Sequence, residues 1–201
     1  MTRTLLVRHG ETDWNAQSRI QGQNDEPLNA RGRAQAASLK ERLAGETIHA
    51  VYASDLARAW ETASLIDAAP VMAEPRLREM HFGEWEGLTY EDIQARDPDV
   101  LARWGAEVMD FTPPGGENLR RFAKRVGAVL GELAQKHEKE TVLIVAHGGS
   151  LQLLVALALG LSPEKYWQFY VKPGSVSEVS LYPEGAILNL LNDTHHFQGI
   201  P

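Results

Sequence analysis

LLVRHG, residues 5–10, carries the most information in the chain, because a short aliphatic run stops there at an arginine, a histidine and a glycine. A second aliphatic run, residues 142–146 (VLIVA), stops in the same way at residues 147–149 (HGG). Such runs are typical of buried strands in a mostly parallel sheet. Ligands of these sheets bind beyond the carboxyl ends of the strands. His9 and His147 follow directly after the two runs, so we expect both at a ligand site. The two stretches therefore predict phosphate chemistry carried by histidine.

Strands and helices are expected to alternate along most of the chain. The expected strands are residues 4–7, 48–53, 71–73 and 141–146, followed by a terminal hairpin of residues 176–181 and 186–191 around 183–185 (PEG). The expected helices are residues 29–44, a helix capped by Ser54 or Asp55 that runs to about Ala68, residues 119–135, residues 150–159 and a short helix that begins at Ser162. Residues 11–28 and 97–118 are expected to be long functional loops.

This alternation predicts an α/β fold: a three-layer α/β/α sandwich with a mostly parallel sheet and an antiparallel C-terminal edge. No repeat, low-complexity tract or linker interrupts the sequence. We therefore expect residues 1–201 to form a single domain.

Composition excludes several classes of function. The formal net charge of −7 disfavours nucleic acid and anionic membranes as partners, so an anionic substrate needs a local cluster of arginines. The absence of cysteine excludes disulfides, thiolate metal sites and cysteine nucleophiles. The chain begins without the apolar core of a signal peptide, and its longest apolar stretch, residues 153–159, is too short to cross a bilayer. We expect a cytoplasmic protein without a membrane segment, and the sequence leaves open whether it forms a homodimer.

Arg8 and His9 are the first candidate pair. A neutral imidazole is a competent nucleophile towards phosphorus, and a neighbouring guanidinium offers forked donors to phosphate oxygens. The alternative is a structural histidine at the end of a strand.

Arg58 is expected in the first turn of a helix, where the helix dipole disfavours a cation. This placement indicates a nearby anion. The alternative is a surface ion pair with Glu61, three residues further along the helix.

Residues 77–87 (LREMHFGEWEG) combine three carboxylates with glycines and aromatic residues. A carboxyl group held partly buried beside aromatic rings can keep its proton and act as a proton donor. Composition does not choose between Glu79, Glu84 and Glu86, and at least two of them are expected to be solvated.

The role of His147 also stays open. It can assist His9, or the amides of Gly148 and Gly149 can hold ligand oxygens at a helix N-terminus. Of the remaining histidines, His49 and His137 are expected to be structural or exposed, and no metal site is expected at residues 195–196.

Together these stretches resemble the histidine phosphatase superfamily, whose cofactor-dependent phosphoglycerate mutases form one branch. The matching motifs are LVRHGET (6–12) with WN (14–15), PLN (27–29), RG (31–32), SDL (54–56) with RA (58–59) and ET (61–62), Glu79 with FG (82–83) and WEG (85–87), and AHGG (146–149). The resemblance covers nearly the whole chain and implies the phosphoglycerate mutase-like fold.

The resemblance also implies roles for individual residues. His9 is the residue that becomes phosphorylated, and Glu79 protonates the leaving oxygen and then activates water. The phosphate pocket is formed by Arg8, Arg58 and His147, with Asn15, Gln21, Gly22 and Gly148 as further substrate-binding residues. No metal and no other cofactor is required.

The resemblance favours a phosphatase over a mutase. Mutases of this family are usually longer, and they carry tyrosine in place of Phe82 and asparagine in place of Gly149. FGEWEG (82–87) instead resembles the short phosphatases of broad specificity and the α-ribazole phosphatases of cobalamin synthesis. PPGGE (113–117) and LNDTHH (191–196) favour the latter, so the expected substrate is a small phosphorylated metabolite such as α-ribazole 5′-phosphate. Trp104, Met109 and Phe111 are candidates to cover its aromatic leaving group.

Three alternatives remain. The chain can have phosphoglycerate mutase activity, it can use the same histidines and acids as ligands in a metal-dependent phosphohydrolase, or it can be a non-catalytic phosphate-binding module. Loss of turnover in His9→Ala, and activity that survives EDTA, distinguish the phosphatase from the last two.

Overall fold

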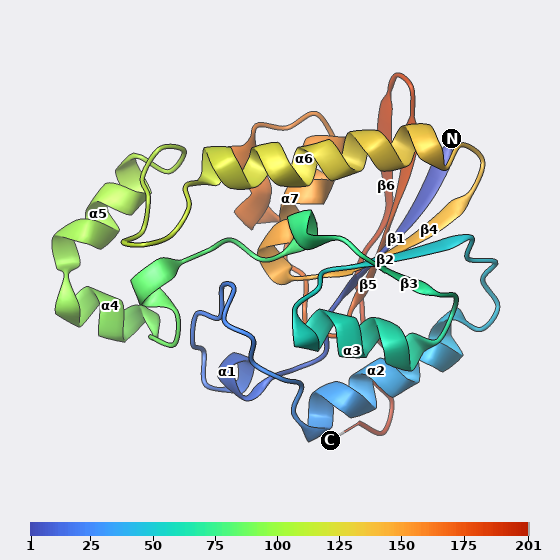
Figure 1. The fold of residues 1–201 in the computed structure, drawn as a ribbon, viewed down its shortest axis with the longest axis horizontal. Coiled ribbons are helices and arrows are strands. Elements are labelled where there is room, and N and C mark those ends of the chain that lie inside the picture. Colours follow the sequence, from blue (N-terminus) through green and yellow to red (C-terminus); the bar gives the residue numbers. More distant parts are fainter. Residues whose placement is uncertain (201) are drawn as a thin grey trace.

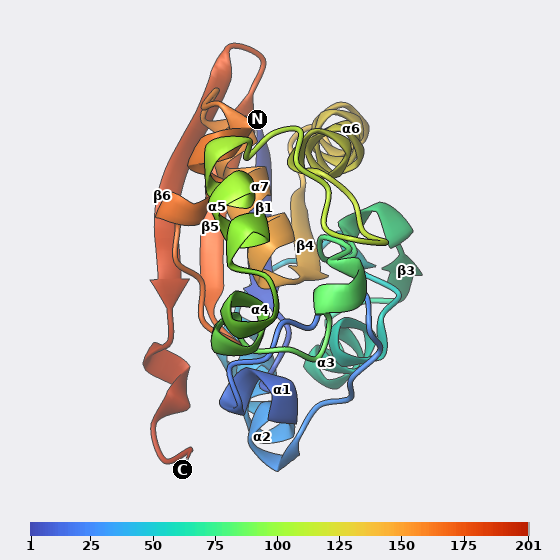
Figure 2. The same cartoon turned by 90° about the vertical axis from the view of Figure 1, so that its left-hand side faces the viewer.

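One six-stranded sheet forms the centre of the protein (Figure 1). The computed structural model describes residues 1–200 of the 201-residue chain. The strands are β1 (Thr2–Arg8), β2 (Ala50–Ala53), β3 (Val71–Ala73), β4 (Thr141–Ala146), β5 (Val176–Tyr182) and β6 (Gly185–Asp193), in the order β3-β2-β4-β1-β5-β6. β3, β2, β4 and β1 are parallel, whereas β5 and β6 are antiparallel to their neighbours. The predicted sheet with an antiparallel C-terminal edge is confirmed, and Figure 2 shows β6 and β3 at opposite sides of it.

Helices connect the strands and cover both faces of the sheet. The α-helices are α1 (Asp13–Ala16), α2 (Ala30–Leu43), α3 (Ala57–Ile66), α4 (Tyr90–Arg96), α5 (Pro98–Ala106), α6 (Leu119–Lys136) and α7 (Gly148–Ala158). Short 3₁₀ helices are η1 (Pro75–Leu77), η2 (Gly83–Trp85), η3 (Pro163–Gln168) and η4 (His195–Phe197). In Figure 1, α6 and α7 lie on one side of the sheet and α2 and α3 on the other, which confirms the three-layer sandwich.

The alternation of side chains along β1 and β4 explains their continuous apolar sequences. Leu6 and Ile144 pack with α6 and α7, where Phe122 is completely buried. Val7 and Val145 pack on the opposite face with α2 and α3. Because both faces are covered, residues 5–7 of β1 and 142–146 of β4 are apolar at consecutive positions.

Three expectations about local structure were wrong. Residues 11–28 were expected to form a loop, but the short helix α1 occupies residues 13–16. Residues 97–118 were expected to be irregular, but α5 occupies the first part of this range. Its start is well capped, since Asp97 accepts a hydrogen bond from the Val100 amide and Pro98 takes the first helical position. The beginning of α3 also differs: Leu56 takes the cap position, and neither Ser54 nor Asp55 caps the helix.

A separate apolar cluster, which includes Ile93 of α4 and Trp104 of α5, packs these two helices against Trp85. Trp85 and Phe111 are buried, and their rings stack with centroids 5.9 Å apart. Trp104 of α5 packs edge-on against Trp85, with centroids 5.4 Å apart. The long segment between β3 and α6 therefore has its own small core and can carry site residues in fixed positions.

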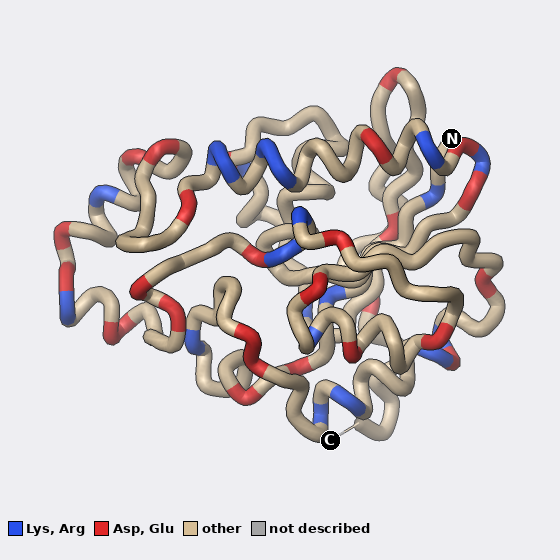
Figure 3. The backbone as a smooth tube through the Cα atoms, in the orientation of Figure 1, with Lys and Arg blue, Asp and Glu red and all other residues tan. Residues whose placement is uncertain are grey.

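Charged residues of both signs are interspersed along the described backbone, as Figure 3 shows. Within residues 1–200, no helix is both long enough and apolar enough to span a membrane.

Candidate active site

The candidate site begins where β1 and β4 end. The two strands are parallel neighbours, and Arg8 pairs with Ala146 at their carboxyl ends. His9 and His147 follow directly, and their ring centroids are 5.1 Å apart. The expectation that both histidines lie at one edge of the sheet is confirmed.

Hydrogen bonding fixes the tautomer of His9. Its Nδ1 lies 2.7 Å from the carbonyl oxygen of Gly10. A carbonyl only accepts, so Nδ1 carries the proton and Nε2 keeps a free lone pair. Burial, together with the positive charges of Arg58 and Arg8, holds the pKa of His9 well below its usual value of 6.5. His9 is therefore a neutral imidazole with Nε2 available as a nucleophile.

Arg8 has an unsatisfied donor. Its Nη1 donates to the carbonyl oxygen of Val171 at 2.7 Å, but its buried Nε has no hydrogen-bond partner. Burial lowers the pKa of Arg8. Gly148 lies against the same guanidinium, since a Cβ at this glycine would be 3.3 Å from the Arg8 Cζ. A buried N–H without a partner, on a residue that lines a cavity, indicates the place of a ligand oxygen.

Arg58 is completely buried near the start of α3. Its Nη1 donates to the Asn24 carbonyl at 2.6 Å and its Nη2 to the Gly22 carbonyl at 2.7 Å. Burial lowers the pKa of Arg58 to about 10. The alternative ion pair with Glu61 is not formed, because Glu61 pairs with Arg33. Arg58 therefore faces the site, as its unfavourable position in the helix predicts.

His147 lies behind Arg58 and has both ring nitrogens occupied. Arg58 Nε donates to His147 Nδ1 at 3.1 Å, so the proton of the neutral ring is on Nε2, which donates to Ser54 Oγ at 2.8 Å. Burial and the charge of Arg58 hold the pKa of His147 well below 6.5. The ring supports Arg58 and contacts His9 but does not line the cavity described below.

The structure distinguishes the three candidate carboxylates. Glu79 lies at the cavity, and its carboxyl group accepts hydrogen bonds from the amides of Gly149 at 2.8 Å and Met80 at 2.9 Å. Glu84 pairs with Arg96 at the surface.

Glu86 has a structural contact. Its Oε1 accepts hydrogen bonds from the amides of Gln23 and Phe82, each at 3.0 Å, and so ties together two loops that border the site. The same carboxylate explains the glycine at position 22, where φ is +52° and a Cβ would lie 2.1 Å from Glu86 Oε1.

These groups surround a cavity of about 220 Å³. It is lined by Arg8, His9, Asn15, Arg19, Ile20, Gln21, Gly22, Arg58, Glu79, Phe82 and Trp104. The side-chain oxygens of Asn15 and Gln21 are both near Thr12, at 3.1 and 3.0 Å from its Oγ1. This contact leaves their amide nitrogens as the groups that can donate at the rim.

Two residues of the cavity wall, Arg19 and Ile20, were not predicted from the sequence. Neither has a motif of its own, and only the loop between α1 and α2 brings them to the rim. Trp104 lines the cavity, whereas Phe111 is buried against Trp85 and Met109 packs on the main core.

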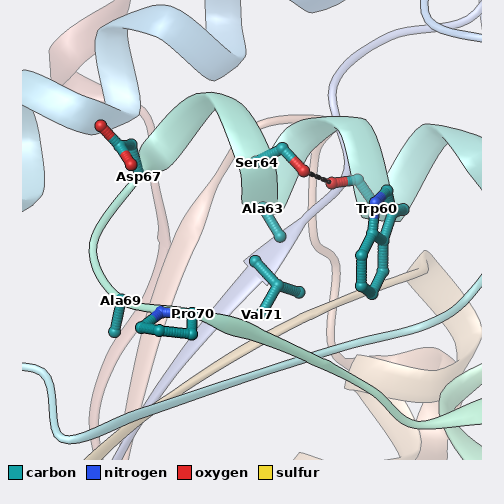
Figure 4. A pocket seen from close by; sticks show the side chains of 7 residues that line it. All are labelled: Trp60, Ala63, Ser64, Asp67, Ala69, Pro70 and Val71. Atoms are coloured by element: carbon teal, nitrogen blue, oxygen red, sulfur yellow. Dashed lines mark hydrogen bonds between the residues drawn. The ribbon is translucent and has the colours of Figure 1, made fainter.

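A larger hollow of about 490 Å³ lies elsewhere, between α3 and β3 (Figure 4). Trp60, Ala63, Ser64, Asp67, Ala69, Pro70 and Val71 line it. Its one charged residue, Asp67, pairs with Lys40. The smaller cavity is the candidate active site because His9, Arg8, Arg58 and Glu79 all line it.

Three other histidines form hydrogen bonds with the backbone or with side chains away from the cavity. His49 Nδ1 accepts from the Thr141 amide at 3.0 Å, and His137 lies between Tyr52 and Glu140. His196 Nε2 is 3.0 Å from the Gly174 carbonyl. Among residues 1–200, no group of three or more His, Cys, Asp or Glu side chains is arranged to hold a metal ion.

The family model described as histidine phosphatase superfamily (branch 1) matches residues 4–194. The chain belongs to the histidine phosphatase superfamily. Adenosylcobalamin/alpha-ribazole phosphatase of Escherichia coli strain K12 is 34% identical over 193 residues, which cover 94% of this chain and 95% of that protein. Metal-independent phosphoserine phosphatase of Arabidopsis thaliana is 35% identical over 207 residues, which cover 100% of this chain and 85% of that protein.

A solved structure gives the same result. The mycobacterial glucosyl-3-phosphoglycerate phosphatase in complex with VO3 superposes with a TM-score of 0.86 and 32% identity, over 96% of this chain and 99% of that one. All three relatives are named phosphatases. The predicted enzyme class is confirmed: the chain is a phosphatase of the histidine phosphatase type.

Gly149→Ala tests whether the position of Glu79 matters. A Cβ at residue 149 would lie 2.3 Å from Glu79 Oε1, so the carboxyl group must move. We expect kcat/KM to fall by up to about 100-fold, the order that a misplacement of about 1 Å costs, with little change in the free energy of unfolding. Gly131→Ala in α6 is the control, because nothing lies within 4 Å of its Cβ. Equal activity of both variants contradicts the placement of Glu79.

The low pKa of His9 predicts a pH dependence of stability. In the unfolded chain this histidine takes up a proton below about pH 6.5, whereas the buried ring stays neutral to lower pH. The free energy of unfolding therefore falls as the pH drops below about 6.5, by about 1.4 kcal/mol per pH unit for this histidine, and is independent of its titration above that pH. Denaturant unfolding of His9→Asn should show a slope shallower by this amount. An unchanged slope contradicts the neutral, buried state of His9.

Proposed function

We propose that this phosphatase is a metal-independent phosphomonoesterase that forms a phosphohistidine on Nε2 of His9. The observation that carries the proposal is the unpartnered, buried Nε of Arg8, a residue that lines the same cavity as His9, whose Nε2 keeps a free lone pair. Arg58 and Glu79 line the same cavity. Nucleophile, anion-binding groups and a proton donor are thus present around one space.

In the first step, His9 Nε2 attacks the phosphorus atom and the bond to the leaving oxygen breaks. Glu79 gives its proton to that oxygen, so the product leaves as an alcohol. Arg8 and Arg58 stabilise the charge on the equatorial oxygens of the transferring phosphoryl group.

In the second step, Glu79 removes a proton from water as the water oxygen attacks phosphorus. The bond between phosphorus and Nε2 breaks, which restores neutral His9 and releases inorganic phosphate. The order of the two steps returns Glu79 to its protonated state, so the cycle is balanced.

Burial of the two arginines favours a dianionic substrate. Each guanidinium loses solvation that no protein carboxylate fully replaces, and this loss lowers the pKa of both arginines. A phosphate dianion between them supplies the missing charge-assisted hydrogen bonds. His147 contributes by holding Arg58 Nε and thereby the direction of the guanidinium.

The cavity wall indicates the class of leaving group. Ile20, Phe82 and Trp104 provide an apolar side, and the Phe82 and Trp104 rings meet edge-on with centroids 6.2 Å apart. A leaving group with a flat apolar ring matches this wall better than the small zwitterion of phosphoserine. α-Ribazole 5′-phosphate is the specific candidate, supported by the name of the Escherichia coli relative.

His9→Ala is the direct test of the proposed intermediate. With a phosphomonoester substrate and EDTA present, the native enzyme should turn over and yield an acid-labile, base-stable phosphoenzyme on rapid quenching. His9→Ala should lose turnover by several orders of magnitude and form no phosphoenzyme, as the nucleophile is absent. His195→Ala, at an exposed histidine, is the control and should behave as native. Turnover in His9→Ala, or inactivation of the native enzyme by EDTA, contradicts the proposal.

Measuring kcat/KM in the same assay distinguishes between candidate substrates. The compounds to compare are α-ribazole 5′-phosphate, phosphoserine and 3-phosphoglycerate, the last with and without 2,3-bisphosphoglycerate. The highest kcat/KM is expected for α-ribazole 5′-phosphate because its ring can pack on the apolar wall. A preference for phosphoserine contradicts the proposed substrate class, and formation of 2-phosphoglycerate supports the mutase alternative instead.

A further inference from the structure

Arg125 of α6 lies beneath the segment that carries Glu79. Its Nη1 donates to the carbonyl oxygens of Arg76 at 2.8 Å and Arg78 at 2.6 Å, and its Nη2 donates to the carbonyl oxygen of Glu79 at 2.7 Å. The Arg125 side chain thus donates to three of the four backbone carbonyls of residues 76–79. The motifs of the sequence do not include Arg125, and it does not line the cavity.

Glu117 completes this contact from the other side. Its carboxylate accepts from Arg125 Nε at 3.2 Å and from Nη2, and it also accepts from the His81 amide at 2.9 Å. The Glu117 amide in turn donates to the His81 carbonyl at 2.8 Å. The pair therefore fixes the backbone on both sides of Glu79.

The geometry of the guanidinium is itself restrained. Its Cζ lies 4.7 Å from the centre of the completely buried Phe122 ring, and its side chain is only 20% exposed. A planar fork with five donors is needed to reach three carbonyls and a carboxylate together, and the ammonium of lysine cannot reproduce it.

The segment needs such support because it has little regular structure of its own. Residues 78–82 lie between η1 and η2, outside any helix or strand. The Glu79 carboxyl group still has to meet the Gly149 amide on α7 and face His9. Without a fixed backbone, the same side chain can point away from the leaving oxygen.

We propose that Arg125, together with Glu117, is a positioning residue for the proton donor Glu79. Arg125 sets the depth of the Glu79 carboxyl group in the cavity and touches neither the phosphate nor the nucleophile. The inference rests on the proposed acid role of Glu79, and it adds a residue from α6 to the catalytic apparatus.

The leaving group of the substrate separates this role from general structural support. p-Nitrophenolate leaves without a proton, whereas an alkoxide needs one, so a misplaced acid slows only alkyl phosphates strongly. We expect Arg125→Lys to lower kcat/KM by at least about tenfold for butyl phosphate and by less than about threefold for p-nitrophenyl phosphate. Arg121→Lys, at an exposed arginine of the same helix, is the control and should match the native enzyme on both substrates.

Two further variants keep the test decisive. Glu117→Gln keeps the shape of the side chain but weakens its hydrogen bonds to Arg125, and it serves as the test if Arg125→Lys folds poorly. It should also lower kcat/KM more for butyl phosphate than for p-nitrophenyl phosphate, by a smaller factor than Arg125→Lys. In a Glu79→Gln background, Arg125→Lys should cause no further loss on butyl phosphate, because the group that it positions is gone.

The outcomes distinguish the inference from the proposed function. Suppose that Glu79→Gln alone lowers kcat/KM mainly for butyl phosphate, so that the acid role stands. The positioning role is then overturned if Arg125→Lys and Glu117→Gln lower kcat/KM equally for both substrates, or if Arg125→Lys causes a further loss in the Glu79→Gln background. A Glu79→Gln variant that loses activity equally on both substrates overturns the acid role itself, and the inference with it.

Discussion

The parallel pairing of β1 with β4 is the constraint on which the site depends. These strands lie side by side at the centre of the sheet, in a register that aligns Arg8 with Ala146. The pairing brings two His-Gly turns, more than 130 residues apart in the chain, together at the carboxyl ends of these central strands. Three further residues approach the site from helix starts or a loop: Arg58 from α3, Gly149 from α7 and Glu79 from the irregular segment between η1 and η2.

Without a bound anion, the positively charged groups at this site lack full electrostatic compensation. Two buried guanidiniums lie near two imidazoles that burial and positive charge keep neutral. Carbonyl oxygens of Gly22, Asn24 and Val171 satisfy part of the arginine donors but carry no full negative charge. The same arrangement that keeps His9 neutral thus favours a dianion, so in the proposed mechanism substrate binding and nucleophile activation have one physical cause.

Much of this arrangement is predictable from the sequence. The strand bounds of residues 71–73 and 141–146 agree with the expectation, because uninterrupted apolar runs with turn residues at their ends allow few other structures. Arg58 was identifiable from its unfavourable place in the helix, and Glu79 only through the resemblance, since three carboxylates share its segment.

Other features depend on tertiary contacts that no local pattern encodes. Arg19 and Ile20 reach the cavity only because their loop folds over it, and α5 gains its place from packing of Trp104 on Trp85. In the sequence, Arg125 is an ordinary charged position of an amphipathic helix. Its hydrogen bonds to backbone carbonyls depend on how residues 76–81 are folded against α6. Hydrogen bonds to the backbone of a distant irregular segment leave no periodicity in the sequence.

A crystal structure of the protein soaked with orthovanadate tests the central claim most directly, because a vanadium centre imitates the transferring phosphoryl group. The phosphohistidine mechanism predicts vanadium bonded to Nε2 of His9, with one oxygen accepting from the Nε of Arg8 and the apical oxygen opposite His9 facing the Glu79 carboxyl group. Vanadate bound away from His9, or bound there while Arg8 Nε stays without a partner, contradicts it.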